Sequence, residues 1–201
     1  QPTAVVIDRR YVDSTFVLQT LWQTDSGQAL VTDFMPVGAG SSSLVRRVTG
    51  LTGTVQMHQE LRIRPGYATV LPWVSRSVDN RVPGSEVLLA MAGPDALALR
   101  GPYLPLAYPH WHEGSFTVSR DEKVDFELTW YPSHRRVPPA TDVDIALGQA
   151  VRYWTRWASH CRHDGVYGEA VKRSLLVLRA LTHQETGGIV AAPTTSLPED
   201  F

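Results

Sequence analysis

The chain has one cysteine, Cys161, so it cannot form an internal disulfide bond, which favours the cytoplasm. It carries 19 basic and 20 acidic residues, and therefore lacks the basic excess of nucleic-acid-binding and anionic-membrane-binding proteins. No apolar run approaches the ~20 residues that cross a bilayer. The first residues also lack the basic start and apolar centre of a signal peptide. We therefore predict neither a nucleic-acid nor a membrane partner.

Signatures of several common enzyme classes are also missing. There is no Gly-x-Ser-x-Gly elbow to carry a nucleophilic serine. There is also no glycine-rich loop that would cradle a phosphate, and we predict no cofactor. Ser133 and His134 are adjacent on an expected strand, and their side chains would point to opposite faces. What remains is a globular composition, with 43% hydrophobic and 19% charged residues.

The first two thirds of the chain has the pattern of β-strands. Apolar and polar residues alternate at 55–64 and at 124–130, which predicts strands with one buried face. Residues 24–27, Thr-Asp-Ser-Gly, predict a hairpin turn between a strand that begins near residue 16 and a return strand at 29–35. Shorter apolar runs, punctuated by glycine and proline, lie at 68–74, 87–92, 96–99 and 116–118. These runs predict a large antiparallel β-sandwich.

Two helices are expected after the Pro138-Pro139 pair. Apolar residues at helical spacing predict the first helix over 141–161, with Thr141 as its N-cap. The second is expected over 167–182, and its apolar run at 175–178 predicts burial on every side. The predicted fold is therefore mainly β: a sandwich followed by two α-helices.

Several segments resemble bacterial glycoside hydrolase family 15, which includes trehalases and glucoamylases. These segments are 31–36 (Val-Thr-Asp-Phe-Met-Pro), 126–134 (Phe-Glu-Leu-Thr-Trp-Tyr-Pro-Ser-His) and 153–157 (Tyr-Trp-Thr-Arg-Trp). The most specific is 191–199, Ala-Ala-Pro-Thr-Thr-Ser-Leu-Pro-Glu, which leans toward the trehalase branch. The resemblance covers nearly the whole chain.

The resemblance implies a division into three parts: a β-sandwich at 1–137, a linker helix at 138–165, and the first helix and loop of an incomplete (α/α)6 barrel at 166–201. It implies an inverting α-glycosidase that hydrolyses trehalose or short α-glucans. The two catalytic glutamates of the family lie beyond residue 201, so no catalytic residue is assigned here. We therefore expect a fragment that is inactive alone and supports the rest of the barrel.

The residues that could contact a sugar lie in the last loop. The resemblance places Pro193, Thr194 and Thr195 at the border of the barrel mouth, where hydroxyl groups and backbone amides can meet a sugar. The alternative is that they only terminate the preceding helix. Fragmentation would expose the apolar second helix, so we expect a partner surface, such as a second copy, to cover it.

Three further groups of residues have a plain and a functional interpretation. His110-Trp111-His112-Glu113 could form a metal site, but its flanking residues favour an exposed polar turn, and no metal site is predicted. Trp22, Trp73, Trp111 and Trp130 could form a carbohydrate platform, although packing in the core or between domains is favoured. The pairs Arg9-Arg10, Arg46-Arg47 and Arg135-Arg136 are expected to be solvated.

Two alternative functions remain open. One is a carbohydrate-binding or scaffold β-sandwich module without catalysis, which a row of exposed tryptophans would favour. The other is the sandwich of a disaccharide phosphorylase, which would need inorganic phosphate for turnover. The 193–199 loop ranks the phosphorylase lower.

Overall fold

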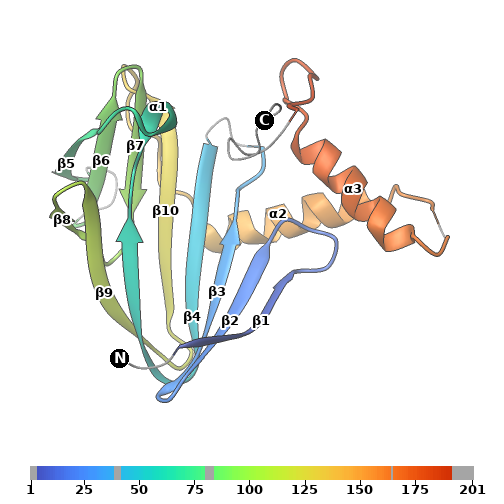
Figure 1. Ribbon diagram of the computed structural model, residues 1–201, viewed down its shortest axis with the longest axis horizontal. Coiled ribbons are helices and arrows are strands. Elements are labelled where there is room, and N and C mark those ends of the chain that lie inside the picture. The colour runs from blue at the N-terminus through green and yellow to red at the C-terminus, as the bar shows by residue number, and fades with distance from the viewer. Residues whose placement is uncertain (1–3, 39–41, 80–83, 164, 192–201) are drawn as a thin grey trace.

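The computed structural model describes residues 4–38, 42–79, 84–163 and 165–191 (Figure 1). Within these residues ten strands form one connected antiparallel system, and the chain is mainly β, as the sequence predicts. The main path runs in the order β1 (Val5–Tyr11), β2 (Leu18–Thr24), β3 (Gly27–Phe34), β4 (Ser42–Leu61), β10 (Lys123–Pro132), β7 (Asp95–Arg100), β6 (Glu86–Ala92) and β5 (Trp73–Val78). β9 (Trp111–Ser119) pairs with β4 on one side and with β8 (Leu106–Tyr108) on the other.

Strand β4 belongs to both layers of the sandwich. Its first half pairs with β3 and β10, whereas Thr54 to Leu61 pair with β9. Two glycines let the strand pass where it changes layer. A Cβ on Gly50 would lie 2.0 Å from the carbonyl oxygen of Ser119, and Gly53 has a φ of +61° that disfavours larger residues. The second layer therefore folds back over the first.

The core lies between these two layers. Val48 of the first part of β4 and Val55 of its second part belong to the same buried cluster. The cluster is completed by residues of β3, β6, β7, β9 and β10: Ala29, Val31, Leu88, Leu99, Phe116, Val118, Val124 and Phe126. Apolar burial from both layers is the arrangement expected of a β-sandwich.

The opposite face of the main sheet is covered by helix α2 (Val143–Ala158). Ala146 and Ala150 of α2 pack on Val17, Phe34 and Val45 in a second buried cluster. The helix begins one residue later than predicted: the side chain of Asp142, not of Thr141, caps it by accepting a hydrogen bond of 3.0 Å from Ile145 N.

Strand β10 departs from the prediction of a single buried face. Val124 and Phe126 point into the core as expected, but Glu127 and Thr129 on the other face are also at least 95% buried. The strand lies in the middle of the sheet, and the segment leading into α2 covers its polar face. The prediction was wrong because alternation shows where apolar groups lie, not that polar groups reach solvent.

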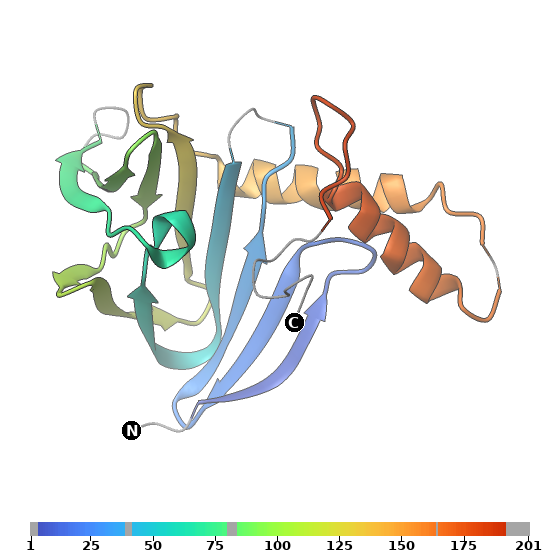
Figure 2. The same ribbon diagram turned by 45° about the horizontal axis from the view of Figure 1, so that its top comes forward.

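Helix α3 (Gly168–Ala180) lies beside α2 and extends beyond the strands (Figure 2). Leu176 is its one buried residue, while Leu178 is 47% exposed. The all-round burial predicted for 175–178 is therefore not reached within the described chain. No helix among the described residues is long and apolar enough to span a membrane.

The remaining predicted elements fall largely in place. The 24–27 turn joins β2 to β3, and the runs at 87–92, 96–99 and 116–118 lie in β6, β7 and β9. Residues 68–74 are the exception, because most of them form the connection from the short helix α1 (Pro65–Ala68) to β5.

Candidate functional site

One cleft in the described part of the chain has a volume of about 490 Å³. It lies between the segment that follows β4 and the neighbouring strands β6, β7 and β10. A second cleft of about 260 Å³ adjoins it, toward β8 and β9. Both are lined by Leu61, Ile63, Arg64 and Pro72, so they lie side by side, and together they are here called the sandwich cleft.

The walls of the sandwich cleft are mainly apolar. Leu97 and Leu128 come from neighbouring strands and lie on the face of the sheet that also carries the core. Leu128 packs directly against the buried core cluster. The cleft therefore continues the interior of the sandwich to the surface, and its floor is held rigidly by the core.

Trp130 is the aromatic residue that lines the larger part of this cleft. Its Nε1 donates a hydrogen bond of 2.9 Å to Oδ1 of Asp95, and the residue remains 42% exposed. Asp95 also lines the cleft. The hydrogen bond fixes the plane of the indole while leaving much of the residue accessible.

Two arginines bring positive charge to the cleft. Arg64 donates to the carbonyl oxygens of Ile63 at 2.9 Å and of His110 at 2.7 Å, which holds its guanidinium in place. Arg62 pairs with Glu60 and lies 5.5 Å from the centre of the Trp111 ring. With Asp95, these residues place both donors and acceptors beside an apolar wall.

The backbone at the rim of the cleft is strained. Gly66, Tyr67 and Ala68 in α1 have φ values of +57°, +55° and +67°. Left-handed conformations at the two non-glycine residues cost on the order of 1 kcal/mol each. The side chain of Thr69 donates to the carbonyl oxygen of Gly66 at 2.5 Å, which helps to hold the turn.

The four tryptophans considered as a carbohydrate platform have different environments. Trp22 packs against the core, as the favoured interpretation expects. Trp73 is 75% exposed, so packing in the core is wrong for it. Trp111 stacks on Tyr108 with ring centres 5.7 Å apart, and Trp130 lines the cleft. The tryptophans therefore do not form a single row.

The sequence predicted an exposed polar turn at His110–Glu113, but only His110 lies in a turn. Pro109 and His110 do form the turn between β8 and β9, with φ of +71° at His110, but Trp111, His112 and Glu113 belong to β9. Burial, aided by the charge of Arg76, lowers the pKa of His112. Among the residues that the structure describes, no three His, Cys, Asp or Glu side chains are grouped to hold a metal.

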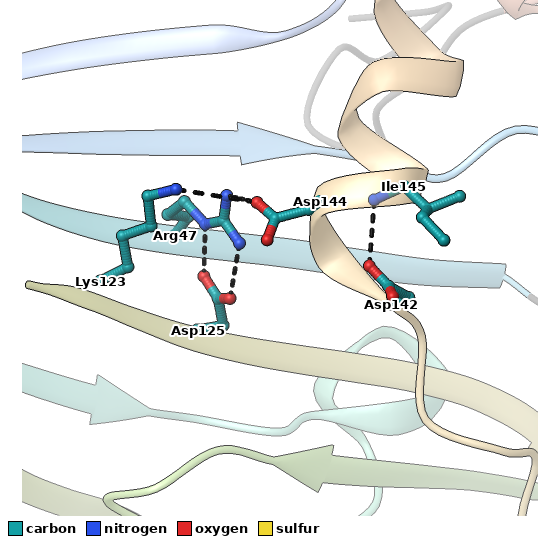
Figure 3. A network of polar contacts seen from close by, with 6 residues as sticks. All are labelled: Arg47, Lys123, Asp125, Asp142, Asp144 and Ile145. Carbon is teal, nitrogen blue, oxygen red and sulfur yellow. Dashed lines mark hydrogen bonds and ion pairs between the residues drawn. The ribbon is translucent and has the colours of Figure 1, made fainter.

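A network of charges lies on the opposite face of the main sheet (Figure 3). Arg47 Nε and Nη2 donate to the two carboxylate oxygens of Asp125 at 2.7 and 2.8 Å, and Nη1 donates to Asp144 at 2.5 Å. Lys123 lies 3.8 Å from the same Asp144 oxygen. The network joins β4 and β10 to the first turn of α2. Arg47 is 7% exposed, so its expected solvation was wrong.

A second polar group closes the same face. Glu127 accepts hydrogen bonds from the backbone N–H and the hydroxyl of Thr141, and Arg100 donates to Asp79 at 2.6 Å and to the carbonyl of Pro138 at 2.7 Å. These contacts hold the 138–142 segment on the sheet. They explain why Thr141, the predicted N-cap, faces the sheet instead of the helix.

The predicted sugar-contacting residues Pro193, Thr194 and Thr195 lie outside the described residues. The sequence pointed to Trp130 but missed Arg62, Arg64 and Asp95. The two arginines occupy polar positions of the alternating pattern at 55–64. That pattern predicts only that they face solvent, as any polar surface residue would. Asp95 follows a Gly-Pro turn, and only the pairing of β7 with β10 brings it to Trp130.

The chain is similar in sequence to several trehalases. No protein-family model matches the chain. The trehalase of Thermoplasma acidophilum is 42% identical over 74 residues, which is 37% of this chain and 11% of that protein. The trehalases of Mycolicibacterium smegmatis and Mycobacterium tuberculosis are each 24% identical over 95% of this chain, covering 32% and 31% of their lengths.

The chain thus spans between about a tenth and a third of the length of these relatives. Among solved structures, a chain described as a candidate kojibiose phosphorylase from the human microbiome aligns over 88% of this chain and 27% of its own. The identity is 6% and the TM-score 0.34, which is too low to carry an argument. The sequence likeness to trehalases is therefore the finding that bears on function.

Proposed function

We propose that this chain is the N-terminal part of an inverting α-glycosidase that hydrolyses trehalose or short α-glucans. The observation that carries the proposal is the match to two mycobacterial trehalases over 95% of the chain. In this proposal 1–137 is the sandwich domain, 138–165 the linker helix, and 166–201 the first helix and loop of the catalytic barrel. Pro193, Thr194 and Thr195 would border the barrel mouth.

Three of the described carboxylates have pKa shifts opposite to the one that a catalytic acid needs. An inverting glycosidase needs two carboxyl groups roughly 6.5–9.5 Å apart, one of which has a raised pKa so that it can protonate the leaving oxygen. Hydrogen bonds from Arg47, Arg62 and Lys172 instead lower the pKa of Asp144, Glu60 and Glu169 respectively. Groups held ionised in this way cannot serve as the general acid.

The exposed apolar side chains of the helical part support a partner surface there. Val166, Tyr167 and Leu178 are 98%, 75% and 47% exposed. In the parent enzyme the rest of the (α/α)6 barrel would cover them, and a second copy would cover them in the isolated chain. Light scattering tests the second case: Leu178→Glu should reduce self-association, whereas Met35→Glu, at a 58% exposed site in the sandwich part, should not.

A chimera tests the proposed function directly. The corresponding N-terminal third of the Mycolicibacterium smegmatis trehalase is replaced by this chain, and glucose release from trehalose is measured. The chimera should remain active, while the 201-residue chain alone should release no glucose. Proton NMR of the first turnovers should show one β-glucose for each α-glucose, the product of inversion at one of the two anomeric carbons.

Three results would contradict the proposal. One is glucose release by the 201-residue chain alone, which would place catalysis within it. The second is a folded chimera, judged by cooperative unfolding, that does not hydrolyse trehalose although the parental trehalase does. The third is formation of glucose 1-phosphate from trehalose and inorganic phosphate by the parent enzyme, which would identify a phosphorylase instead of a hydrolase.

A further inference from the structure

We propose that the sandwich cleft is itself a carbohydrate-binding site, in which a short α-glucoside stacks on Trp130 and is held by Arg62, Arg64 and Asp95. The existence of the site rests on the cleft. The choice of an α-glucoside as ligand rests on the proposed function.

The size and shape of the cleft suit an oligosaccharide. Its larger part, of about 490 Å³, falls within the range of about 300–1,000 Å³ typical of small-molecule sites. The adjoining part of about 260 Å³ shares four lining residues with it, so one ligand can contact both parts. A ligand of two or three linked sugar rings fits the two parts together better than a single ring does.

Trp130 has the properties of a stacking platform. Sugar rings present a face of C–H groups that packs on an aromatic face, provided that the aromatic ring is accessible and fixed. The bond from Nε1 to Asp95 fixes the ring, and 42% of the residue is exposed. Trp111 cannot serve equally, because it already stacks on Tyr108 and lies beneath Arg62.

The polar groups of the cleft favour a hydroxylated ligand over an apolar partner. Arg64 uses donors on two carbonyl oxygens and retains others of its five N–H groups, and Asp95 accepts one hydrogen bond of the several that a carboxylate can take. An apolar protein surface seated here would bury this unused capacity without partners, which is unfavourable. Sugar hydroxyls both donate and accept, so they satisfy arginine and carboxylate together.

The left-handed turn at the rim is a second, independent sign of a functional surface. Three consecutive residues, Gly66 to Ala68, hold positive φ values beside the cleft, and Pro65 and Gly66 line it. Strained backbone of this kind persists where the surrounding structure over-determines it and is frequent at ligand sites. Tyr67 is 84% exposed at this turn.

Titration of the ¹⁵N-labelled 201-residue chain with trehalose, maltose and maltotriose tests the site. The six tryptophan indole N–H resonances report each ring separately. The Trp130 resonance should shift with at least one of the sugars, with dissociation constants in the millimolar range, typical of weak binding. Trp130→Ala should weaken binding at least tenfold, as removal of a central aromatic contact does.

Trp73→Ala is the matched control. Trp73 is also exposed, yet it lines neither part of the cleft, whereas the next residue, Val74, does. Adjacent strand residues point to opposite faces. Loss of Trp73 should therefore leave binding unchanged. Trp130→Phe, which keeps a ring but loses the bond to Asp95, should bind between the wild type and Trp130→Ala, and it covers the case in which the alanine variant fails to fold.

Four results would overturn the inference. They are the absence of a sugar-induced shift at Trp130, equal weakening by the Trp73 and Trp130 substitutions, shifts that map away from the cleft, and a dimer that Trp130→Ala dissociates. The last would identify the cleft as a contact between copies of the chain. An inactive chimera with intact sugar binding would refute the proposed function alone, and an active chimera without a shift at Trp130 would refute the site alone.

Discussion

The two faces of the main sheet are stabilised by different means. The face that points into the sandwich is closed by apolar side chains, such as Val48, Leu99 and Phe126. On the face toward α2, apolar contacts are joined by buried polar groups, among them Arg47 and Glu127. Apolar burial is non-directional, whereas a buried charge must meet a partner with correct geometry.

This difference explains how the helix is positioned. The buried residues that α2 contributes to the apolar cluster are alanines, whose short side chains do little to fix a helix along its axis. The contacts of Arg47 with Asp144 and of Glu127 with Thr141 are directional, and they bind the start of α2 at one place on the sheet. The apolar face therefore supplies most of the stability, and the polar face supplies position.

The largest expected effect is on the apolar face. Phe126 is 7% exposed and packs on Phe116, with ring centres 5.3 Å apart. Phe126→Ala should lower the free energy of unfolding by about 4 kcal/mol, because it leaves a cavity in the core. Urea denaturation measures this loss. The control is Leu44→Ala, at a 45% exposed position of β4 that pairs with Leu128 of β10. If Phe126→Ala lowered the free energy of unfolding less than Arg47→Ala does, the polar face would contribute more to stability than the apolar face.

The next effect is on the polar face. Arg47→Ala should cost about 3 kcal/mol, because the carboxylate of Asp125, which is only 31% exposed, loses its paired cation. Its neighbour Arg46 provides the control. Arg46 makes a comparable two-bond pair with Asp33, but its side chain is 57% exposed. Arg46→Ala should therefore cost less than about 1 kcal/mol.

The same pair of substitutions tests whether the network positions α2. Loss of Arg47 should increase amide hydrogen exchange in the first turn of α2 more than in the core of the sheet. Loss of Arg46 should leave exchange in α2 as it is. Equal losses of stability from the two substitutions would show that burial of Arg47 adds nothing.

A smaller effect is expected at a neutral buried pair. The hydroxyl oxygens of Ser43 and Thr129 lie 3.0 Å apart, and both residues are nearly inaccessible. Thr129→Val should cost about 1–2 kcal/mol, because it leaves the Ser43 hydroxyl buried without a partner. The double variant with Ser43→Ala should cost less than the sum of the two single variants. Strict additivity would mean that the two hydroxyls do not interact.

The sequence predicted those helices and strands that have one buried face and one exposed face. The second half of β4, the β2–β3 hairpin and both long helices were located from periodicity and turn residues. Strand β1 was missed because every one of its residues is exposed at the edge of the sheet, so no pattern marks it. Local patterns report local burial, and an edge strand has little of it.

The polar network and the cleft could not be read from the sequence for a different reason. Arg47 and Asp144 are 97 residues apart, and Asp95 and Trp130 are 35 apart. Only the strand order brings these partners together. Arg46 and Arg47 are identical in type and adjacent in sequence, yet one is exposed and the other buried, because they point to opposite faces of β4. The sequence could therefore name Trp130 but not its surroundings.

The smallest effect concerns pH and again involves the polar face. The hydrogen bond from Arg47, with the charges of Arg47 and Lys123, lowers the pKa of Asp144. A lowered folded-state pKa means that the unfolded chain binds more protons in that range, so this contribution is present above about pH 4 and is lost as the pH falls through the folded-state value. Asp144→Asn should make stability less steeply dependent on pH below about 4. Urea unfolding at several acidic pH values measures the slope, with Asp121→Asn, whose side chain is 90% exposed, as the control. An unchanged slope would show that water screens the contact of Asp144 with Arg47 so strongly that it adds nothing to stability. Asp125 alone would then hold Arg47 in place.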